Sequence, residues 1–141
     1  MLKLKIFSIG KMKEKWLEQA FGEYQKRLMN RVHIDCFWAK SDAQLMEWIE
    51  KESGVIALDP LGRQFTSEEF SVFLENCWEE NGARITFVIG GPEGLPPGLK
   101  QKACLISLSS LTFTHQITRL ILIEQIYRAV EIQKGSQYHK A

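Results

Sequence analysis

The sequence lacks the features that mark secreted, membrane and metal-binding proteins. Its three cysteines are odd in number and far apart, which argues against a disulfide framework and against a zinc site. No apolar run reaches the ~20 residues that a membrane helix needs. The N-terminus alternates lysine with apolar residues and has no continuous apolar stretch typical of a signal peptide. We therefore expect a cytoplasmic protein with no membrane contact and no bound metal.

Several common catalytic and nucleotide-binding motifs are also missing. The chain has no G-x-x-x-x-G-K-[ST] loop, no G-x-G-x-x-G after its first strand, no G-x-S-x-G turn and no H-E-x-x-H pair. These absences argue against a P-loop nucleoside triphosphatase and against Rossmann-type dehydrogenases and methyltransferases. They also argue against a hydrolase with a nucleophile elbow and an enzyme with a helical histidine pair on zinc.

The net charge is small, because 18 Lys and Arg are balanced by 17 Asp and Glu to give +1 over 141 residues. The charges are nevertheless unevenly distributed: residues 1–31 carry +5, residues 32–84 carry −7 and residues 85–141 carry +3. A local basic face can be hidden in such a total, although three solvated surfaces without a partner would give the same counts. The sum excludes a broadly basic protein but not an enzyme that acts on RNA.

Apolar spacing predicts strands that alternate with helices. The predicted strands cover residues 2–10, 32–38, 55–58, 85–89 and 104–108, and the predicted helices cover residues 14–28, 45–49, 66–82 and 115–134. The third strand is expected to stop at Asp59 and Pro60. This alternation indicates an α/β fold with a mainly parallel sheet, and no linker divides residues 1–141, so we predict a single domain.

The helix over residues 115–134 is apolar around most of its circumference, which indicates burial on most sides. We expect a second copy of the chain to cover what one sheet cannot, through a two-fold interface. Cys36 and Cys104 lie in apolar runs and are expected to be buried. The four tryptophans, among them Trp16, are interpreted as core or boundary packing.

Ligands of open α/β sheets bind outside the carboxyl ends of the strands. Here those ends are Leu58 with Asp59, the glycine-rich residues 90–95, and residues 107–113. Gly90 and Gly91 allow a close approach to the backbone. A tight turn from strand to helix without any ligand would explain the glycines equally well.

Two positions in the last helix are candidates for chemistry. His115 begins this helix directly after residues 107–113, where the positive end of the helix dipole favours a neutral imidazole. A role in capping or packing is an equal alternative. Arg119 lies one turn later and can share the face of His115.

Further along the helix, Arg128 has glutamates at helical spacing on both sides, so an ion-pair network is its simplest interpretation. The polar tail contains Tyr138, His139 and Lys140. An aromatic ring, an imidazole and a cation together suit stacking on a base and contact with phosphate. Exposure without function is the usual alternative for such a tail.

The sequence closely resembles the RlmH family of SPOUT-class methyltransferases in two segments, residues 87–95 (FVIGGPEGL) and 108–116 (LSSLTFTHQ). The resemblance continues through Arg119, Glu124, residues 127–129 and the final Tyr-His-Lys. The similarity extends over the whole chain. It implies an α/β domain with a C-terminal trefoil knot, a feature that periodicity does not predict because knots are very rare. It also implies a homodimer that transfers a methyl group from S-adenosyl-L-methionine to N3 of a pseudouridine in 23S ribosomal RNA, within the large subunit or the assembled ribosome.

The resemblance also implies site residues. Carried over by position, the cofactor contacts are Leu58, Gly90, Leu108, Ser109, Ser110, Leu111, Thr112 and Phe113. His115 or His139 would accept the N3 proton, Arg119 or Arg128 would stabilise the anionic base, and Tyr138, His139 and Lys140 would hold RNA.

The chain departs from the family pattern in two places, because Thr114 stands where many members have proline and the stretch before Val55 is short. Two other functions stay open. One is methylation of another RNA such as tRNA, and the other is a catalytically silent dimer that binds the ribosome.

Overall fold

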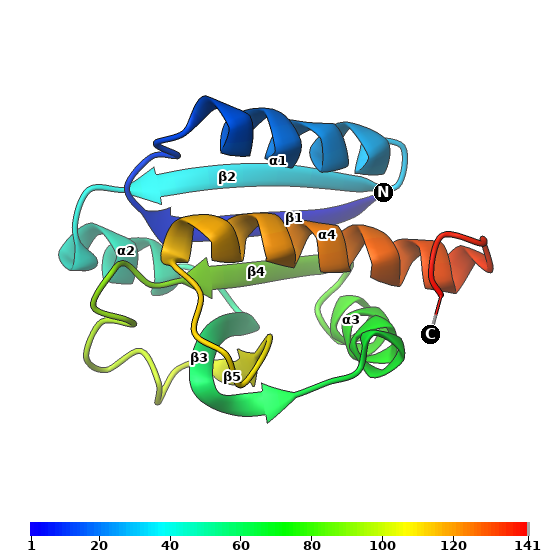
Figure 1. The fold of residues 1–141 in the computed structure, drawn as a ribbon. Helices are drawn as coiled ribbons and strands as arrows, with labels where there is room; N and C mark the ends of the chain where they lie inside the picture. The colour runs from blue at the N-terminus through cyan, green and yellow to red at the C-terminus, as the bar shows by residue number, and fades with distance from the viewer. Residues whose placement is uncertain (141) are drawn as a thin grey trace.

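A computed structural model describes residues 1–140 as a five-stranded sheet with helices on both faces (Figure 1). In chain order the elements are β1 (Leu2–Ile9), α1 (Lys15–Leu28), β2 (Val32–Ala39), α2 (Asp42–Ile49), β3 (Val55–Gln64), α3 (Ser67–Glu80), β4 (Arg84–Ile89), β5 (Cys104–Ser107) and α4 (His115–Lys134). The strand order is β2-β1-β4-β3-β5, and all paired strands are parallel. The predicted α/β fold is confirmed, and the trefoil knot stays a prediction.

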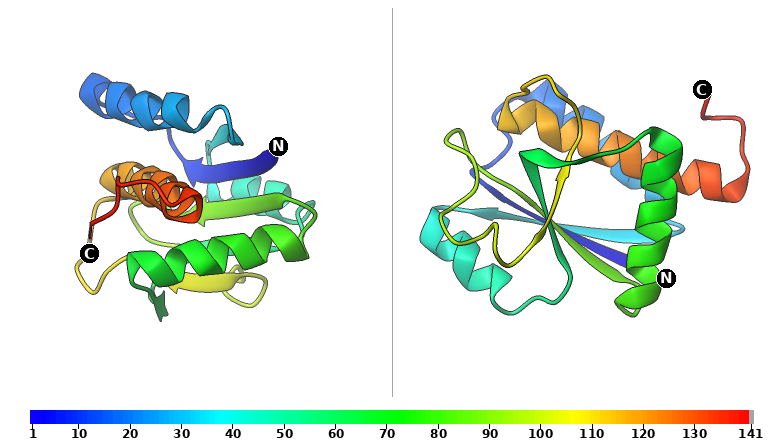
Figure 2. Two further views of the ribbon diagram at one scale, coloured as in Figure 1. Left: turned by 90° about the vertical axis from the view of Figure 1, so that its right-hand side faces the viewer. Right: turned by 90° about the horizontal axis from the view of Figure 1, so that it is seen from below.

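The helices form two layers of unequal size. Helices α1, α3 and α4 pack on one face of the sheet, with α4 between the other two (Figure 2). Helix α2 covers the other face together with residues 95–103. The larger core joins apolar residues of β1 and β4, such as Ile6 and Phe87, to α4 residues such as Ile126. Because both faces are covered, residues 55–58 of β3 and 87–89 of β4 are apolar without interruption.

Local sequence signals set the ends of two helices. Thr66 and Glu69 form the predicted capping box at α3: the Thr66 Oγ1 accepts from the Glu69 N–H at 3.1 Å, and the Thr66 N–H donates to the Glu69 carboxylate at 2.8 Å. Helix α4 starts at Thr114, whose hydroxyl accepts the N–H of Ile117, and ends at Gly135 in the left-handed conformation.

The predicted end of the third strand is wrong. β3 continues past Asp59 and Pro60 to Gln64, with an irregularity between Leu58 and Arg63, after which Arg63 pairs with Ile106 of β5. A bulge is one of the few sites where a strand tolerates proline, so the proline marks an interruption here and not the end of the strand. Gly62 makes this possible, because a Cβ atom there would lie 2.5 Å from the backbone nitrogen of Ile106.

Several expectations about packing also need correction. Helices α1 and α3 of the same subunit cover the sides of α4, while Ile117 stays 40% exposed, so the second copy remains a prediction. Cys104 is exposed because β5 is an edge strand. Cys36 is partly buried, and this desolvation raises the pKa of its thiol to about 12. Trp16 is 54% exposed and does not belong to the core. No helix within residues 1–140 is long and apolar enough to cross a membrane.

Candidate functional site

A cleft of about 810 Å³ lies at the carboxyl ends of β3, β4 and β5. Its walls come from the loops that follow these strands and from the first turns of α1 and α4. The lining residues fall within the segments 13–17, 58–60, 89–95 and 107–118. The cleft therefore occupies the edge of the sheet where α/β proteins bind their ligands.

Seven of the eight predicted cofactor contacts line this cleft: Leu58, Gly90, Leu108, Ser109, Leu111, Thr112 and Phe113. Ser110 does not line it. Its hydroxyl instead accepts a hydrogen bond from the Gln64 side chain at 3.0 Å, which ties the loop after β5 to the end of β3. The loops that follow β3, β4 and β5 thus meet at one cavity.

The loop after β4 turns back sharply on itself. The Gly94 N–H donates to the Gly91 carbonyl at 3.0 Å, and Gly94 has φ of 88°. A Cβ atom at Gly90 would lie 2.5 Å from the Gly94 carbonyl carbon and 2.8 Å from the Leu95 nitrogen. Only glycine fits there, because these neighbours are backbone atoms that cannot move aside alone.

The loop after β5 is shaped by its own serines. The Ser107 hydroxyl donates to the Ser109 carbonyl at 2.9 Å, and the Ser109 hydroxyl accepts the Leu111 N–H at 3.0 Å. Within the described part of the chain, residues 109–113 make no backbone–backbone hydrogen bond. Most of their peptide groups are therefore available to a polar ligand in the cleft.

His115 lies on the cleft wall at the first turn of α4. The Gln116 amide next to it is oriented by the β1–α1 loop: its oxygen accepts the Lys13 N–H at 3.3 Å, and its nitrogen donates to the Lys11 carbonyl at 3.1 Å. That same nitrogen lies 3.3 Å from His115 Nε2, so Nε2 faces a donor and keeps its lone pair. Burial lowers the pKa of His115, and the charges of Arg119 and Lys13 lower it further.

Arg119 is wholly buried behind the cleft and does not line it. Its Nη2 lies 2.8 Å from the Ile9 carbonyl and 2.7 Å from the Gly10 carbonyl, and its guanidinium stacks 4.3 Å from the Trp38 ring. Within residues 1–140, its Nε and Nη1 have no hydrogen-bond partner. Burial lowers the pKa of Arg119 to about 10, so it stays charged at neutral pH. Arg119 therefore holds the end of β1 against α4 through these hydrogen bonds.

The remaining candidates form a second cluster at the other end of α4. Arg128 donates to Glu124 at 2.9 Å, as its helical spacing predicts, and also lies 3.0 Å from His139 Nδ1. The Tyr138 hydroxyl donates to Glu124 at 2.7 Å. Burial, followed by the bond to Glu124, raises the pKa of Tyr138. Lys140 is exposed, and Ala141 lies outside the described residues.

Sequence reasoning missed one wall of the cleft, formed by Lys13, Glu14 and Trp16. The signal was available, because these residues follow the carboxyl end of β1 just as the other loops follow their strands. Apart from this position after β1, no motif in these residues predicts that they line a cleft. Within residues 1–140, no group of three or more His, Cys, Asp or Glu side chains could hold a metal ion.

Comparison with known proteins places this geometry in a family. A family model described as "Predicted SPOUT methyltransferase" matches residues 2–139. A curated protein of Protochlamydia amoebophila, named "Ribosomal RNA large subunit methyltransferase H", is 67% identical over 140 residues, which is 99% of this chain and 100% of that protein. The chain belongs to the RlmH family of SPOUT methyltransferases.

Other similar proteins are more distant. A protein of the same name from Streptococcus uberis is 42% identical over 159 residues, covering 99% of this chain and all of its own length. That alignment is longer than the 141 residues of this chain, so the streptococcal protein contains insertions that are missing here. A solved structure from work on the 2-OH methylation of C/U34 on tRNA covers 95% of this chain and 98% of its own, with TM-score 0.51 and 12% identity. That similarity concerns the SPOUT fold alone.

Proposed function

We propose that this SPOUT methyltransferase transfers a methyl group from S-adenosyl-L-methionine to N3 of a pseudouridine in 23S ribosomal RNA, in the cytoplasm. The main support is one coincidence of sequence and geometry. The motifs that resemble the RlmH family, residues 87–95 and 108–116, meet in a single cleft. The whole-length relative at 67% identity is named as a methyltransferase of large-subunit ribosomal RNA.

The cleft suits the cofactor in size and in lining. Its volume of about 810 Å³ lies in the range of small-molecule sites, and its walls are mainly apolar, with Leu58, Leu108 and Phe113 among them. The peptide groups of residues 109–113 offer donors and acceptors for an adenine edge. The closely packed turn at Gly90 lets a ligand approach the backbone. S-adenosyl-L-methionine supplies an electrophilic methyl group when it is bound.

The protein must also remove a proton, because N3 of pseudouridine carries one that leaves as the N–C bond forms. His115 suits this role better than His139. Its Nε2 is unprotonated at the wall of the cleft, and its lowered pKa keeps the imidazole neutral. The single 3.3 Å contact with the Gln116 amide must give way before Nε2 accepts the N3 proton. Both nitrogens of His139 are already engaged within the tail cluster.

The two arginines are assigned different parts. Arg128 has its guanidinium partly exposed beside Tyr138 and can stabilise an anionic base. Arg119 is enclosed, so it acts by holding the end of β1 and the adjoining loop in place beside His115. Tyr138, His139 and Lys140 would contact RNA.

These parts cannot all meet in one subunit. His115 and Arg128 lie 13 residues apart on one helix, which is roughly 20 Å at 1.5 Å per residue. A homodimer that brings the tail of one subunit to the cleft of the other would unite them. Trp16, Leu111 and Ile117 are exposed apolar residues on the wall of the cleft, and they suit contact with a second copy.

Mixed dimers test this arrangement directly. A His115→Ala chain and a chain truncated before Tyr138 should each be inactive on 23S RNA, and the truncated chain should still bind S-adenosyl-L-methionine in calorimetry. Mixing the two should restore part of the activity, because each mixed dimer contains one intact site and one site that lacks both His115 and the tail. Inactive mixtures would contradict a site shared between subunits.

The nature of the substrate is tested in the cell. Mass spectrometry of ribosomal RNA from a deletion strain should show loss of one methyl-pseudouridine, which the intact gene should restore. If the ribosomal RNA is unchanged and a methyl group disappears from tRNA, the ribosomal substrate is wrong. If calorimetry detects no cofactor binding, the proposed methyl transfer is wrong, and a catalytically silent ribosome-binding dimer becomes the better candidate.

A further inference from the structure

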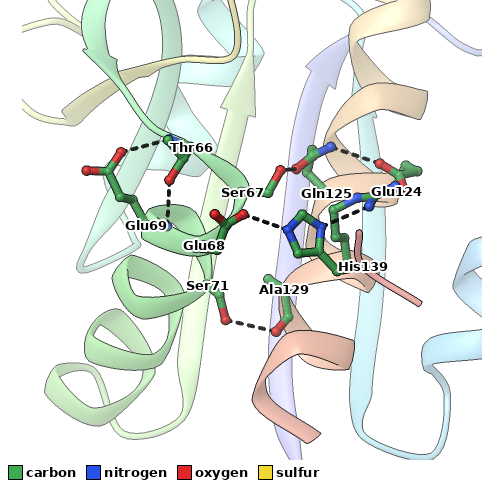
Figure 3. Close-up of polar contacts among 10 residues, drawn as sticks. Thr66, Ser67, Glu68, Glu69, Ser71, Glu124, Gln125, Ala129 and His139 are labelled. Carbon is green, nitrogen blue, oxygen red and sulfur yellow. Dashed lines mark hydrogen bonds and ion pairs between the residues drawn. The ribbon is translucent and has the colours of Figure 1, made fainter. Parts of the chain in front are cut away.

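Glu68 in the first turn of α3 points at the tail and not along its own helix (Figure 3). Its neighbour Glu69 is already used by the capping box. The Glu68 Oε1 lies 2.6 Å from His139 Nε2, joining residues that are 71 positions apart. No helix-capping requirement explains this contact.

The contacts of His139 determine its protonation pattern. Its Nδ1 lies 3.0 Å from Arg128 Nη1, and a guanidinium can only donate. Nδ1 must therefore accept and carries no proton. Nε2 carries the proton and donates it to the Glu68 carboxylate. Glu68 thus stabilises the same neutral tautomer of His139 that the Arg128 contact requires, in the way that a carboxylate orients a histidine in many enzyme sites.

The selected tautomer in turn holds Arg128. The guanidinium is held between the Glu124 carboxylate at 2.9 Å and His139 Nδ1 at 3.0 Å, and it lies 4.9 Å from the Tyr138 ring centre. The opposite tautomer would direct an N–H at the guanidinium and break this contact. Glu68 therefore acts through His139 on Arg128 and Tyr138.

Helix α3 is rigidly placed to do this. The Ser67 hydroxyl donates to the Gln125 side chain at 2.8 Å, and the buried Ser71 hydroxyl donates to the Ala129 carbonyl at 2.9 Å, both across to α4 (Figure 3). Glu68 lies between these two bonds. Its backbone is therefore fixed relative to α4 before any substrate arrives.

We propose that Glu68 is a positioning residue that pre-organises the C-terminal tail for RNA, by fixing the His139 tautomer and thereby the direction of the Arg128 guanidinium. The proposal rests on the proposed function, because it assumes that the tail contacts RNA. It does not assign Glu68 any contact with the cofactor or with the reacting base. A pre-ordered tail loses less conformational entropy when RNA binds, so Glu68 should affect RNA affinity.

Three variants of the full-length chain separate this role from a general charge effect. Glu68→Ala removes the acceptor, and Glu68→Gln keeps an oxygen that can accept the Nε2 proton. Glu75→Ala is the matched control, because Glu75 is an exposed carboxylate of the same helix with no hydrogen bond or ion pair inside the described region. Long-range ¹H–¹⁵N spectra of labelled protein report the tautomer of His139, and steady-state methylation reports KM and kcat.

We expect a single Nε2-protonated tautomer in the wild-type chain, in Glu68→Gln and in Glu75→Ala, and a mixture in Glu68→Ala. Because Glu68 is about half exposed, its loss should raise KM for 23S RNA about three- to tenfold, with kcat and cofactor affinity within about twofold of wild type. An unchanged tautomer in Glu68→Ala, or a changed tautomer with unchanged KM, overturns the proposal. If the wild-type chain methylates no 23S RNA, the proposed function fails, and the tautomer spectra still decide whether Glu68 sets the state of His139.

Discussion

Replacing Gly90 with alanine should strain the turn after β4 and weaken cofactor binding while the rest of the protein stays folded. The added Cβ would lie 2.5 Å from the Gly94 carbonyl carbon and 2.8 Å from the Leu95 nitrogen, both well inside ordinary van der Waals contact. These atoms are backbone, so the whole turn must move. Overpacking of this kind costs about 1–3 kcal/mol.

That strain should appear in cofactor binding, because the turn that must move forms a wall of the cleft. Since 1.4 kcal/mol is about tenfold in affinity, we expect Gly90→Ala to weaken binding of S-adenosyl-L-methionine roughly 5- to 150-fold in calorimetry. Gly91→Ala is the matched control, because its Cβ would meet only the Ile9 side chain, at 3.6 Å. It should bind within about twofold of wild type.

Two outcomes would refute this reasoning. If Gly90→Ala binds the cofactor as tightly as wild type, the turn after β4 is not part of the cofactor site. If both variants lose affinity equally, the close contact at Gly90 is not the cause. Thermal unfolding of each variant shows whether the molecule is still folded at the temperature of the binding measurement.

Three further predictions concern protonation and stability. Burial and the charges of Arg119 and Lys13 lower the pKa of His115, so the imidazole stays neutral to lower pH and the acid limb of the kcat/KM profile should lie below 6.5. Lys13→Gln removes one positive charge, so it should move that limb to higher pH in rate measurements against pH. Thr66→Ala removes the α3 cap and should cost about 1 kcal/mol, which calorimetry should record as a fall in melting temperature of roughly 3 °C. Gly62→Ala forces a Cβ against the Ile106 backbone and should destabilise the chain by about 1–3 kcal/mol in urea unfolding, whereas unchanged stability would show that β3 and β5 can separate there freely.

Periodicity and strand-end reasoning predicted most of the fold and the location of the cleft from the sequence. The bounds of α4 match because Thr114 and Gly135 are local signals that act within one turn. Leu58, Gly90 and Leu108 meet because the carboxyl ends of parallel strands must share one edge. Such inferences need only the chain's own spacing.

Contacts between distant segments could not be predicted in this way. Nothing near Pro60 indicates that β3 resumes pairing with β5, since that depends on Gly62 fitting against Ile106. The complete enclosure of Arg119 depends on carbonyl groups about 110 positions earlier in the chain. The contact of Glu68 with His139 could not be predicted either, because the two residues are 71 positions apart and do not share a helix.

Ion pairing explains why the net charge is a poor guide to the partner. Acidic residues of the middle segment 32–84 pair with basic residues of both flanks, as in Lys5–Glu52, Lys100–Asp59 and Lys102–Glu50. Part of the charge cancellation is therefore local, within ion pairs that also join segments of the fold. By contrast, exposed lysines at positions 11, 13 and 15 have no ion pair within residues 1–140, and the loop that carries them borders the cleft. These lysines are thus free to attract phosphate at the edge of the cleft where an RNA would reach the methyl group.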